Sequence, residues 1–94
     1  MITANSQELI IMFICSPRDL ALLVVNRRKQ LKLSQAAVGK LVGLKQQTIS
    51  DFEKKPEGTK LETLFRILSA VKLDVTILTK DEISPHESLW NEEW

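Results

Sequence analysis

SQAAVGKLVGLKQQTISDFEKK, residues 34–55, contains two short helical patterns joined by a glycine. Ser34 can accept hydrogen bonds from the free N–H groups at a helix start, and Gly43 can adopt the left-handed conformation that ends a helix. A second helix is then expected from about Gln46 to Lys54, after a connection of about three residues. The residues expected to face inward are Val38, Leu41, Ile49 and Phe52. Two helices joined so closely predict a helix-turn-helix motif.

The second helix of this motif begins with side chains that form hydrogen bonds. In a helix-turn-helix motif, this end of the helix lies against base edges in the major groove of DNA. Glutamine can form two bonds with adenine, lysine can bind guanine, and hydroxyl groups can bind a base or a phosphate. We therefore expect base contacts within residues 45–51, with Gln46 and Gln47 determining the preferred sequence. The expected phosphate contacts are Gln35, Thr48, Arg28 and Lys40. The alternative is an ordinary exposed helix face.

One further helix is expected on each side of the motif. Ser16 and Pro17 are typical of a helix start, so a helix is predicted from about Pro17 to Lys29. After a loop at Pro56–Gly58, a helix is predicted from about Leu61 to Val71. Its apolar residues recur at helical spacing and are expected to share one face. They are Leu61, Leu64, Phe65, Leu68 and Val71.

The distribution of charge indicates a polyanionic partner more clearly than the net charge of +1 does. Residues 20–50 contain no Asp or Glu and carry six basic residues. Residues 81–94 contain no Lys or Arg and carry five acidic residues. A charged stretch is usually only a solvated face, but 31 residues without an acid favour nucleic-acid binding.

The pattern changes after the last predicted helix. Apolar and polar residues alternate over Leu73–Thr79, which predicts one β-strand. A single strand is not stable in water, so it must pair either with Leu9–Ile14 or with the same strand of a second chain. The expected organisation is an N-terminal arm (1–15), a helix-turn-helix domain (16–72), a dimerisation strand (73–80) and a flexible acidic tail (81–94).

Several classes of protein are disfavoured by the sequence. The longest apolar run, Leu9–Cys15, has seven residues and is too short for a membrane helix, so the cytoplasm is the default location. Cys15 is the only cysteine and is expected to be a buried small apolar residue. His86 is the only histidine, so we expect no metal site, no cofactor and no catalytic constellation. The chain is predicted not to be an enzyme.

The segment from Leu20 to Val75, about 60% of the chain, resembles the Cro/C1-type (XRE) helix-turn-helix family. The resemblance is carried by RRKQLKLSQAAVGKLVGLKQQTISDFEKK (27–55) and TKLETLFRILSAVKLDV (59–75). It implies a mainly α, lambda-repressor-like domain of four to five helices with a C-terminal strand that pairs across a dimer. Without a further partner, such a protein is a plain transcriptional repressor. A protein-interaction module that has lost DNA binding is the alternative from another class.

LKQQTISDFE (44–53) is more closely similar to IKQATISNFE, the recognition segment of HipB-type antitoxins. That family consists of dimeric repressors of their own toxin–antitoxin operon that also neutralise a HipA-type serine/threonine kinase toxin. The resemblance implies a homodimer bound to a palindromic operator, with half-sites about 34 Å or a multiple apart. By position it assigns base reading to Lys45, Gln46, Gln47 and Ser50.

The sequence departs from the family pattern at several positions. Gln47 replaces Ala and Asp51 replaces Asn, so the preferred operator is expected to differ and no DNA contact is expected of Asp51. Arg27 occupies a position that is usually apolar, and Lys32 stands where the turn often has glycine. Three residues of the first predicted helix are apolar where polar ones are more usual: Leu22, Leu23 and Val25.

The acidic tail ends in SLWNEEW, residues 88–94, which holds both tryptophans of the chain. An aromatic residue on a tethered tail can insert into a pocket of a partner and anchor the tail there. From composition alone, a chance terminal tryptophan, exposed or folded back on its own domain, is favoured. The resemblance reverses this preference and implies that Trp94, Glu93 and Trp90 contact the kinase.

Overall fold

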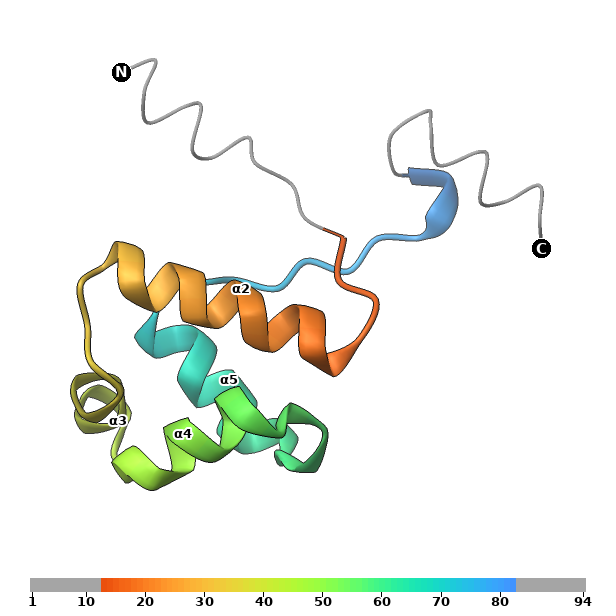
Figure 1. The fold of residues 1–94 in the computed structure, drawn as a ribbon. Helices are drawn as coiled ribbons and strands as arrows, with labels where there is room; N and C mark the ends of the chain where they lie inside the picture. Colours follow the sequence, from red (N-terminus) through yellow and green to blue (C-terminus); the bar gives the residue numbers. More distant parts are fainter. Residues whose placement is uncertain (1–12, 83–94) are drawn as a thin grey trace, which may run out of the picture.

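The computed structural model describes residues 13–82, and four α-helices form the main part of them (Figure 1). They are α2 (Pro17–Gln30), α3 (Gln35–Val42), α4 (Gln46–Lys54) and α5 (Leu61–Ala70). Two short 3-10 turns are also present. The turn η1 (Pro56–Gly58) follows α4, and η2 (Lys80–Glu82) ends the described part of the chain. The predicted mainly helical class and the four predicted helices are confirmed.

The expected capping residues fix the helix ends. The Ser16 hydroxyl accepts a hydrogen bond from the Asp19 N–H at 3.1 Å, and the Ser34 hydroxyl accepts one from the Ala37 N–H at 3.0 Å. Gly43 has a φ of 73° and ends α3. The chain needs only Gly43–Lys45 to turn from α3 into α4, which confirms the helix-turn-helix motif.

A second glycine makes this turn possible. The Leu44 N–H donates to the Gly39 carbonyl at 2.8 Å, so the turn folds back against α3. A Cβ atom at Gly39 would overlap the Leu44 carbonyl oxygen. Gly39 therefore permits the close approach of the turn to α3, a role that the sequence alone did not indicate.

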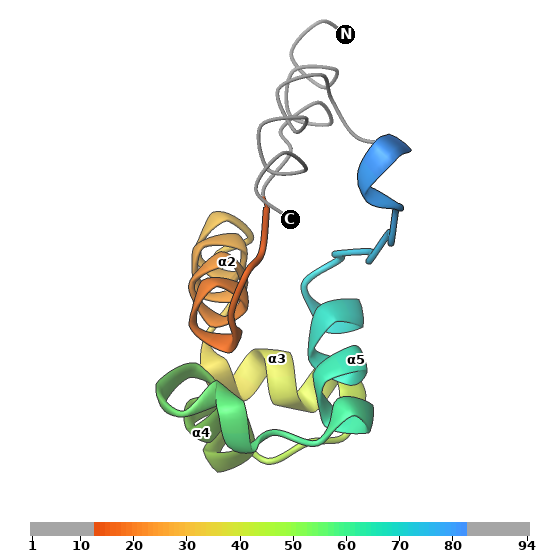
Figure 2. The ribbon, with the colours of Figure 1, turned by 90° about the vertical axis from the view of Figure 1, so that its right-hand side faces the viewer.

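The core lies where the four helices meet. In Figure 2, α2 and α5 stand on opposite sides, α3 runs between them and α4 lies below α2. Ile49 and Phe52 of α4 are 0% and 2% exposed, which confirms their predicted inward orientation. The other buried apolar residues are Ala21, Val24, Val38, Ile67, Leu68, Ala70 and Val71. Because the core is built from all four helices, it fixes the position of α4 relative to α3.

Two lysines adopt the left-handed conformation that glycine favours. Lys32, after α2, has a φ of 59°, and Lys72, after α5, has a φ of 60°. The residue after each lysine donates its N–H to a carbonyl five residues earlier, at 3.1 Å for Leu33 and 2.9 Å for Leu73. This is the bonding of a Schellman helix end, and it explains why glycine often occupies the position of Lys32.

Some residues predicted to be buried are exposed. Leu41 is 61% exposed, so the prediction that it faces inward was wrong. Leu61 and Phe65 are 70% and 56% exposed, so the prediction that they share one face with the buried Leu68 and Val71 was also wrong. The inner face of α5 consists of Leu64, Ile67, Leu68 and the following Val71, which leaves Leu61 and Phe65 on its outer side. Cys15 is also exposed, because it precedes α2 outside the core.

The predicted dimerisation strand does not form within a single chain. Within residues 13–82 no strand is assigned, and 73–79 leaves α5 as an irregular stretch. Val75, Ile77 and Leu78 are 54%, 89% and 52% exposed. Pairing across a dimer needs a second chain, so it stays a prediction.

Parts of the predicted organisation lie outside the described residues. These are most of the N-terminal arm, including residues 9–12 of the alternative pairing segment, and residues 83–94 with His86, Trp90, Glu93 and Trp94. None of the helices in residues 13–82 is long and apolar enough to cross a lipid bilayer.

Candidate nucleic-acid interface

The N-terminal end of α4 carries the exposed polar side chains that the sequence singled out. Lys45, Gln46 and Gln47 are exposed, and Thr48 is half-buried. Lys45 precedes the helix and forms no side-chain cap, so the helix start remains open to an outside hydrogen-bond acceptor. Partial positive charge at a helix N-terminus favours an anion such as a DNA phosphate. This end of α4 therefore has the donors that a DNA interface requires.

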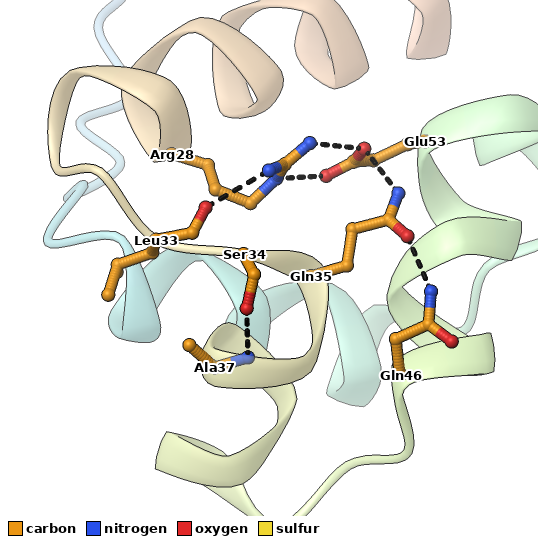
Figure 3. Close-up of polar contacts among 7 residues, drawn as sticks. All are labelled: Arg28, Leu33, Ser34, Gln35, Ala37, Gln46 and Glu53. Carbon is orange, nitrogen blue, oxygen red and sulfur yellow. Dashed lines mark hydrogen bonds and ion pairs between the residues drawn. The ribbon is translucent and has the colours of Figure 1, made fainter.

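A hydrogen bond joins the starts of the two helices of the motif (Figure 3). The Gln46 Nε2 atom donates to the Gln35 Oε1 atom at 2.6 Å. Gln35 is the first residue of α3 and Gln46 is the first residue of α4. The bond brings the predicted phosphate-binding and base-reading glutamines together, eleven residues apart in the sequence.

Glu53 connects this pair to α2. Its carboxylate accepts a bond from Gln35 Nε2 at 2.9 Å and two from Arg28, at 2.8 and 3.0 Å. The Arg28 and Glu53 side chains are only 12% and 8% exposed. Arg28 also donates to the Leu33 carbonyl at 3.0 Å, so it supports the turn before α3. Figure 3 shows the continuous chain of contacts from Arg28 to Gln46.

This chain of contacts sets the direction of both glutamine amides. An ionised carboxylate only accepts hydrogen bonds. Gln35 must therefore turn its NH₂ group toward Glu53, and its oxygen then faces Gln46. Gln46 must in turn give one N–H to Gln35, which leaves its oxygen and its other N–H for a ligand. One acceptor and one donor are the pair that adenine binds in the major groove.

The comparisons with known proteins agree with this geometry. Residues 25–78 match the helix-turn-helix family HTH_3. The antitoxin HipB of Escherichia coli (strain K12) is 38% identical over 82 residues, which cover 86% of this chain and 93% of the relative. The chain belongs to the HipB family of helix-turn-helix antitoxins.

Solved structures of HipB also resemble this fold. A complex of HipB with an O4 20mer has a TM-score of 0.71 and 38% identity, over 73% of this chain and 97% of that one. A HipA–HipB–O2–O3 complex has the same TM-score of 0.71 and 38% identity, again over 73% of this chain and 97% of that one. The resemblance to the HipB family inferred from the sequence is thereby confirmed.

Two residues assigned to DNA by sequence have a different environment. Ser50 follows Gln46 and Gln47 by one helical turn on α4, but it is only 6% exposed, so little of its side chain is open to a ligand. Arg28 is largely enclosed by its ion pair with Glu53 and its bond to Leu33. The geometry supports neither as a direct DNA contact, and both assignments stay predictions for this HipB-family chain.

Two lysines remain available for phosphates. Lys40 on α3 and Lys45 before α4 are exposed, and neither forms an ion pair within residues 13–82. The negative charge of Glu53 on α4 is compensated by Arg28. Lys45 therefore offers an unpaired positive charge at the start of α4, and Lys40 offers one in the last turn of α3.

Glu53 is the main residue of the site that the sequence interpretation missed. It was noted only as part of the family motif. Its spacing from Gln46, seven residues or about two helical turns, was a signal that both lie along one side of α4. The partner on α2 could not be identified without the fold. No group of three or more His, Cys, Asp or Glu residues that could hold a metal occurs within the described part of the chain.

Proposed function

We propose that this chain is a dimeric, sequence-specific DNA-binding antitoxin that represses its own toxin–antitoxin operon and neutralises a HipA-type serine/threonine kinase toxin. The observation that carries the DNA-binding part is the Gln35–Gln46 bond at the joined starts of α3 and α4. It brings two amides together at the start of α3, which Ser34 caps, and the start of α4, which has no side-chain cap. Membership of the HipB family supports the antitoxin part.

The proposed contacts divide into two kinds. Lys45, Gln46 and Gln47 read base edges, whereas Gln35, Thr48 and Lys40 bind phosphates. Phosphate contacts supply affinity that falls with salt, and base contacts supply the choice of sequence. Ser50 and Arg28 belong to the same predicted set, and we assign Arg28 to holding Glu53 and Gln35 in place.

Dimerisation is proposed through residues 73–80. Val75, Ile77 and Leu78 are exposed apolar residues in one short segment, and a β-strand needs a second strand for its hydrogen bonds. A twofold dimer would place two α4 helices on successive major grooves of a palindromic operator. This proposal assigns the protein to the cytoplasm, with no enzymatic activity of its own.

Contact with the kinase is proposed for the C-terminal tail, through Trp94, Glu93 and Trp90. The chemical basis is that the tail combines aromatic side chains, which can fill a pocket of the kinase, with acidic groups that can bind basic residues around it. This proposal is supported by the solved HipA–HipB–O2–O3 complex, in which a protein 38% identical to this chain is assembled with HipA.

DNA binding is tested by fluorescence anisotropy with the DNA upstream of the protein's own gene. We expect specific binding whose affinity decreases as salt increases, and a large loss in the Gln46→Ala variant. A Lys40→Gln variant should weaken binding to all sequences alike and reduce the slope of log affinity against log salt by about 1. Binding that is independent of salt would contradict the proposal.

Toxin binding is tested by a pull-down from lysate of the native host in which the neighbouring kinase-sized gene is expressed. The bait is the full chain or a chain that lacks Trp94. We expect the kinase to bind the full chain and to bind the shortened one more weakly. Equal recovery with both would assign the contact to another part of the chain, and recovery with neither would contradict the antitoxin proposal.

A further inference from the structure

A second glutamine of α4 has its own carboxylate partner. The Gln47 Nε2 atom donates to the Asp51 Oδ1 atom at 2.8 Å. The two residues are four apart on one helix, and both are exposed. They are also two of the three positions at which the recognition segment differs from IKQATISNFE, where Ala and Asn stand instead, the third being Leu44 in place of Ile. The two substitutions are therefore in direct contact with each other.

The bond sets the direction of the Gln47 amide. Because a carboxylate cannot donate, the NH₂ group of Gln47 must face Asp51. The Gln47 oxygen and its remaining N–H are left for another ligand. Asp51 forms no ion pair with a basic residue within residues 13–82, so its acceptor capacity is not taken by a cation.

Adenine and guanine present different hydrogen-bonding groups to such an amide. Adenine offers the N6 donor and the N7 acceptor in the major groove, whereas guanine offers two acceptors, N7 and O6. An amide whose oxygen faces the base matches adenine and repels guanine O6. An amide free to rotate by half a turn can instead direct its NH₂ group at the two guanine acceptors. Fixing the amide therefore favours adenine over guanine.

We propose that Gln47 and Asp51 form a specificity-determining pair, in which Asp51 positions the Gln47 amide to select adenine in the operator. The inference rests on the proposed DNA-binding function and deepens it. The Gln46 amide is oriented by different contacts, because it donates to Gln35, which in turn donates to Glu53. Two neighbouring glutamines are thus oriented independently, each by a separate carboxylate.

A purely structural explanation of the pair is the alternative. Hydrogen bonds between Gln and Asp four residues apart stabilise helices without any ligand. Asp51 also places a negative charge near the phosphates, which weakens binding to every sequence. Both effects are independent of the operator sequence, whereas a positioning role changes the ratio of affinities for two bases. That ratio decides between the explanations.

The experiment starts with the full chain and a pool of randomised double-stranded oligonucleotides, from which the wild-type protein selects its operator. The position assigned to Gln47 is the one whose base preference is lost in Gln47→Ala. Affinities for operators with adenine or guanine there are then measured for wild type, Asp51→Asn and Glu62→Gln. Glu62 is a matched control, since it is also exposed and bonded to a residue four positions away, Arg66 on α5.

In Gln47→Ala we expect the adenine-to-guanine affinity ratio to fall by about 5- to 150-fold, the range for one bidentate base contact. In Asp51→Asn the ratio should fall by at least about fivefold at this position and stay constant at the position read by Gln46. Overall affinity should rise, because one anion near the DNA is removed. Glu62→Gln should leave both ratios unchanged.

Three outcomes would overturn the inference. An unchanged ratio in Gln47→Ala at every operator position would remove Gln47 as a base contact. A uniform gain in affinity with an unchanged ratio in Asp51→Asn would reduce Asp51 to an electrostatic effect. If the wild-type protein selects no sequence at all, the proposed DNA-binding function fails, and the inference fails with it.

Discussion

Arg28 of α2 and Glu53 of α4 form a two-bond ion pair, with nitrogen-to-oxygen distances of 2.8 and 3.0 Å. The pair lies behind the candidate DNA-binding surface and is largely excluded from solvent. Glu53 also holds Gln35, whose amide holds Gln46. A structural ion pair therefore determines how an exposed glutamine is presented, and the fold and the candidate site depend on the same two residues.

Loss of one member of this ion pair should destabilise the fold. Arg28→Met leaves the Glu53 carboxylate largely buried without a counter-ion, which should lower the free energy of unfolding by about 3 kcal/mol. Urea unfolding measures the change. The control is Glu62→Gln, which removes the exposed ion pair with Arg66 on α5 and should cost less than about 0.5 kcal/mol. Equal losses in the two variants would show that burial of the Arg28–Glu53 pair has no energetic consequence.

Gly39 should not tolerate even one added methyl group. In Gly39→Ala the new Cβ would overlap the Leu44 carbonyl oxygen, so the turn before α4 must move. We expect a loss of about 1–3 kcal/mol in the free energy of unfolding. Thermal unfolding followed by circular dichroism measures it. Gly58→Ala is the matched control, since no atom lies within 4 Å of a Cβ there. A variant as stable as this control would contradict the close approach at Gly39.

Replacement of Lys32 or Lys72 by glycine should stabilise the fold. Both lysines are left-handed, a conformation that costs a non-glycine residue about 1–2 kcal/mol relative to the usual one. Part of this gain is offset by the greater freedom of glycine in the unfolded chain. Lys32→Gly and Lys72→Gly should therefore each raise the free energy of unfolding by about 0.5–1 kcal/mol, measured by urea unfolding.

The control for these two variants is Gly43→Ala, at the left-handed position that ends α3. It should lower stability by about 1 kcal/mol, because alanine is disfavoured there. The three variants together test one conformational effect in both directions. A destabilised Lys32→Gly or Lys72→Gly variant would mean that the lysine side chain contributes more than its backbone conformation costs.

Local features of the sequence predicted the helices well. Ser16, Ser34 and Gly43 act on the backbone within a few residues, so their roles can be inferred without the fold. The same holds for Gln46 and Gln47, whose exposure follows from their place at the start of a polar helix. A local signal is sufficient wherever the interaction itself is local.

Other features depend on contacts between distant residues. Phe65 belongs to the apolar pattern of α5, but the pattern does not say how wide a face the other helices cover. The roles of Glu53 and Gly39 require the packing of α4 on α2 and of the turn on α3. Gln47 and Asp51 were both recognised as unusual, yet only the structure revealed that they are bonded to each other.

Ile77 should be essential for dimerisation if residues 73–80 pair with a second chain. It is 89% exposed in the single chain, and aspartate there would place a charge in the apolar interface. Size-exclusion chromatography with light scattering should give a dimer for wild type and a monomer for Ile77→Asp, which should also bind the palindromic operator more weakly. Leu22→Asp on α2, at a residue 54% exposed, is the control and should remain a dimer. A dimeric Ile77→Asp variant would place the interface elsewhere, because one buried charge per chain should separate such short strands.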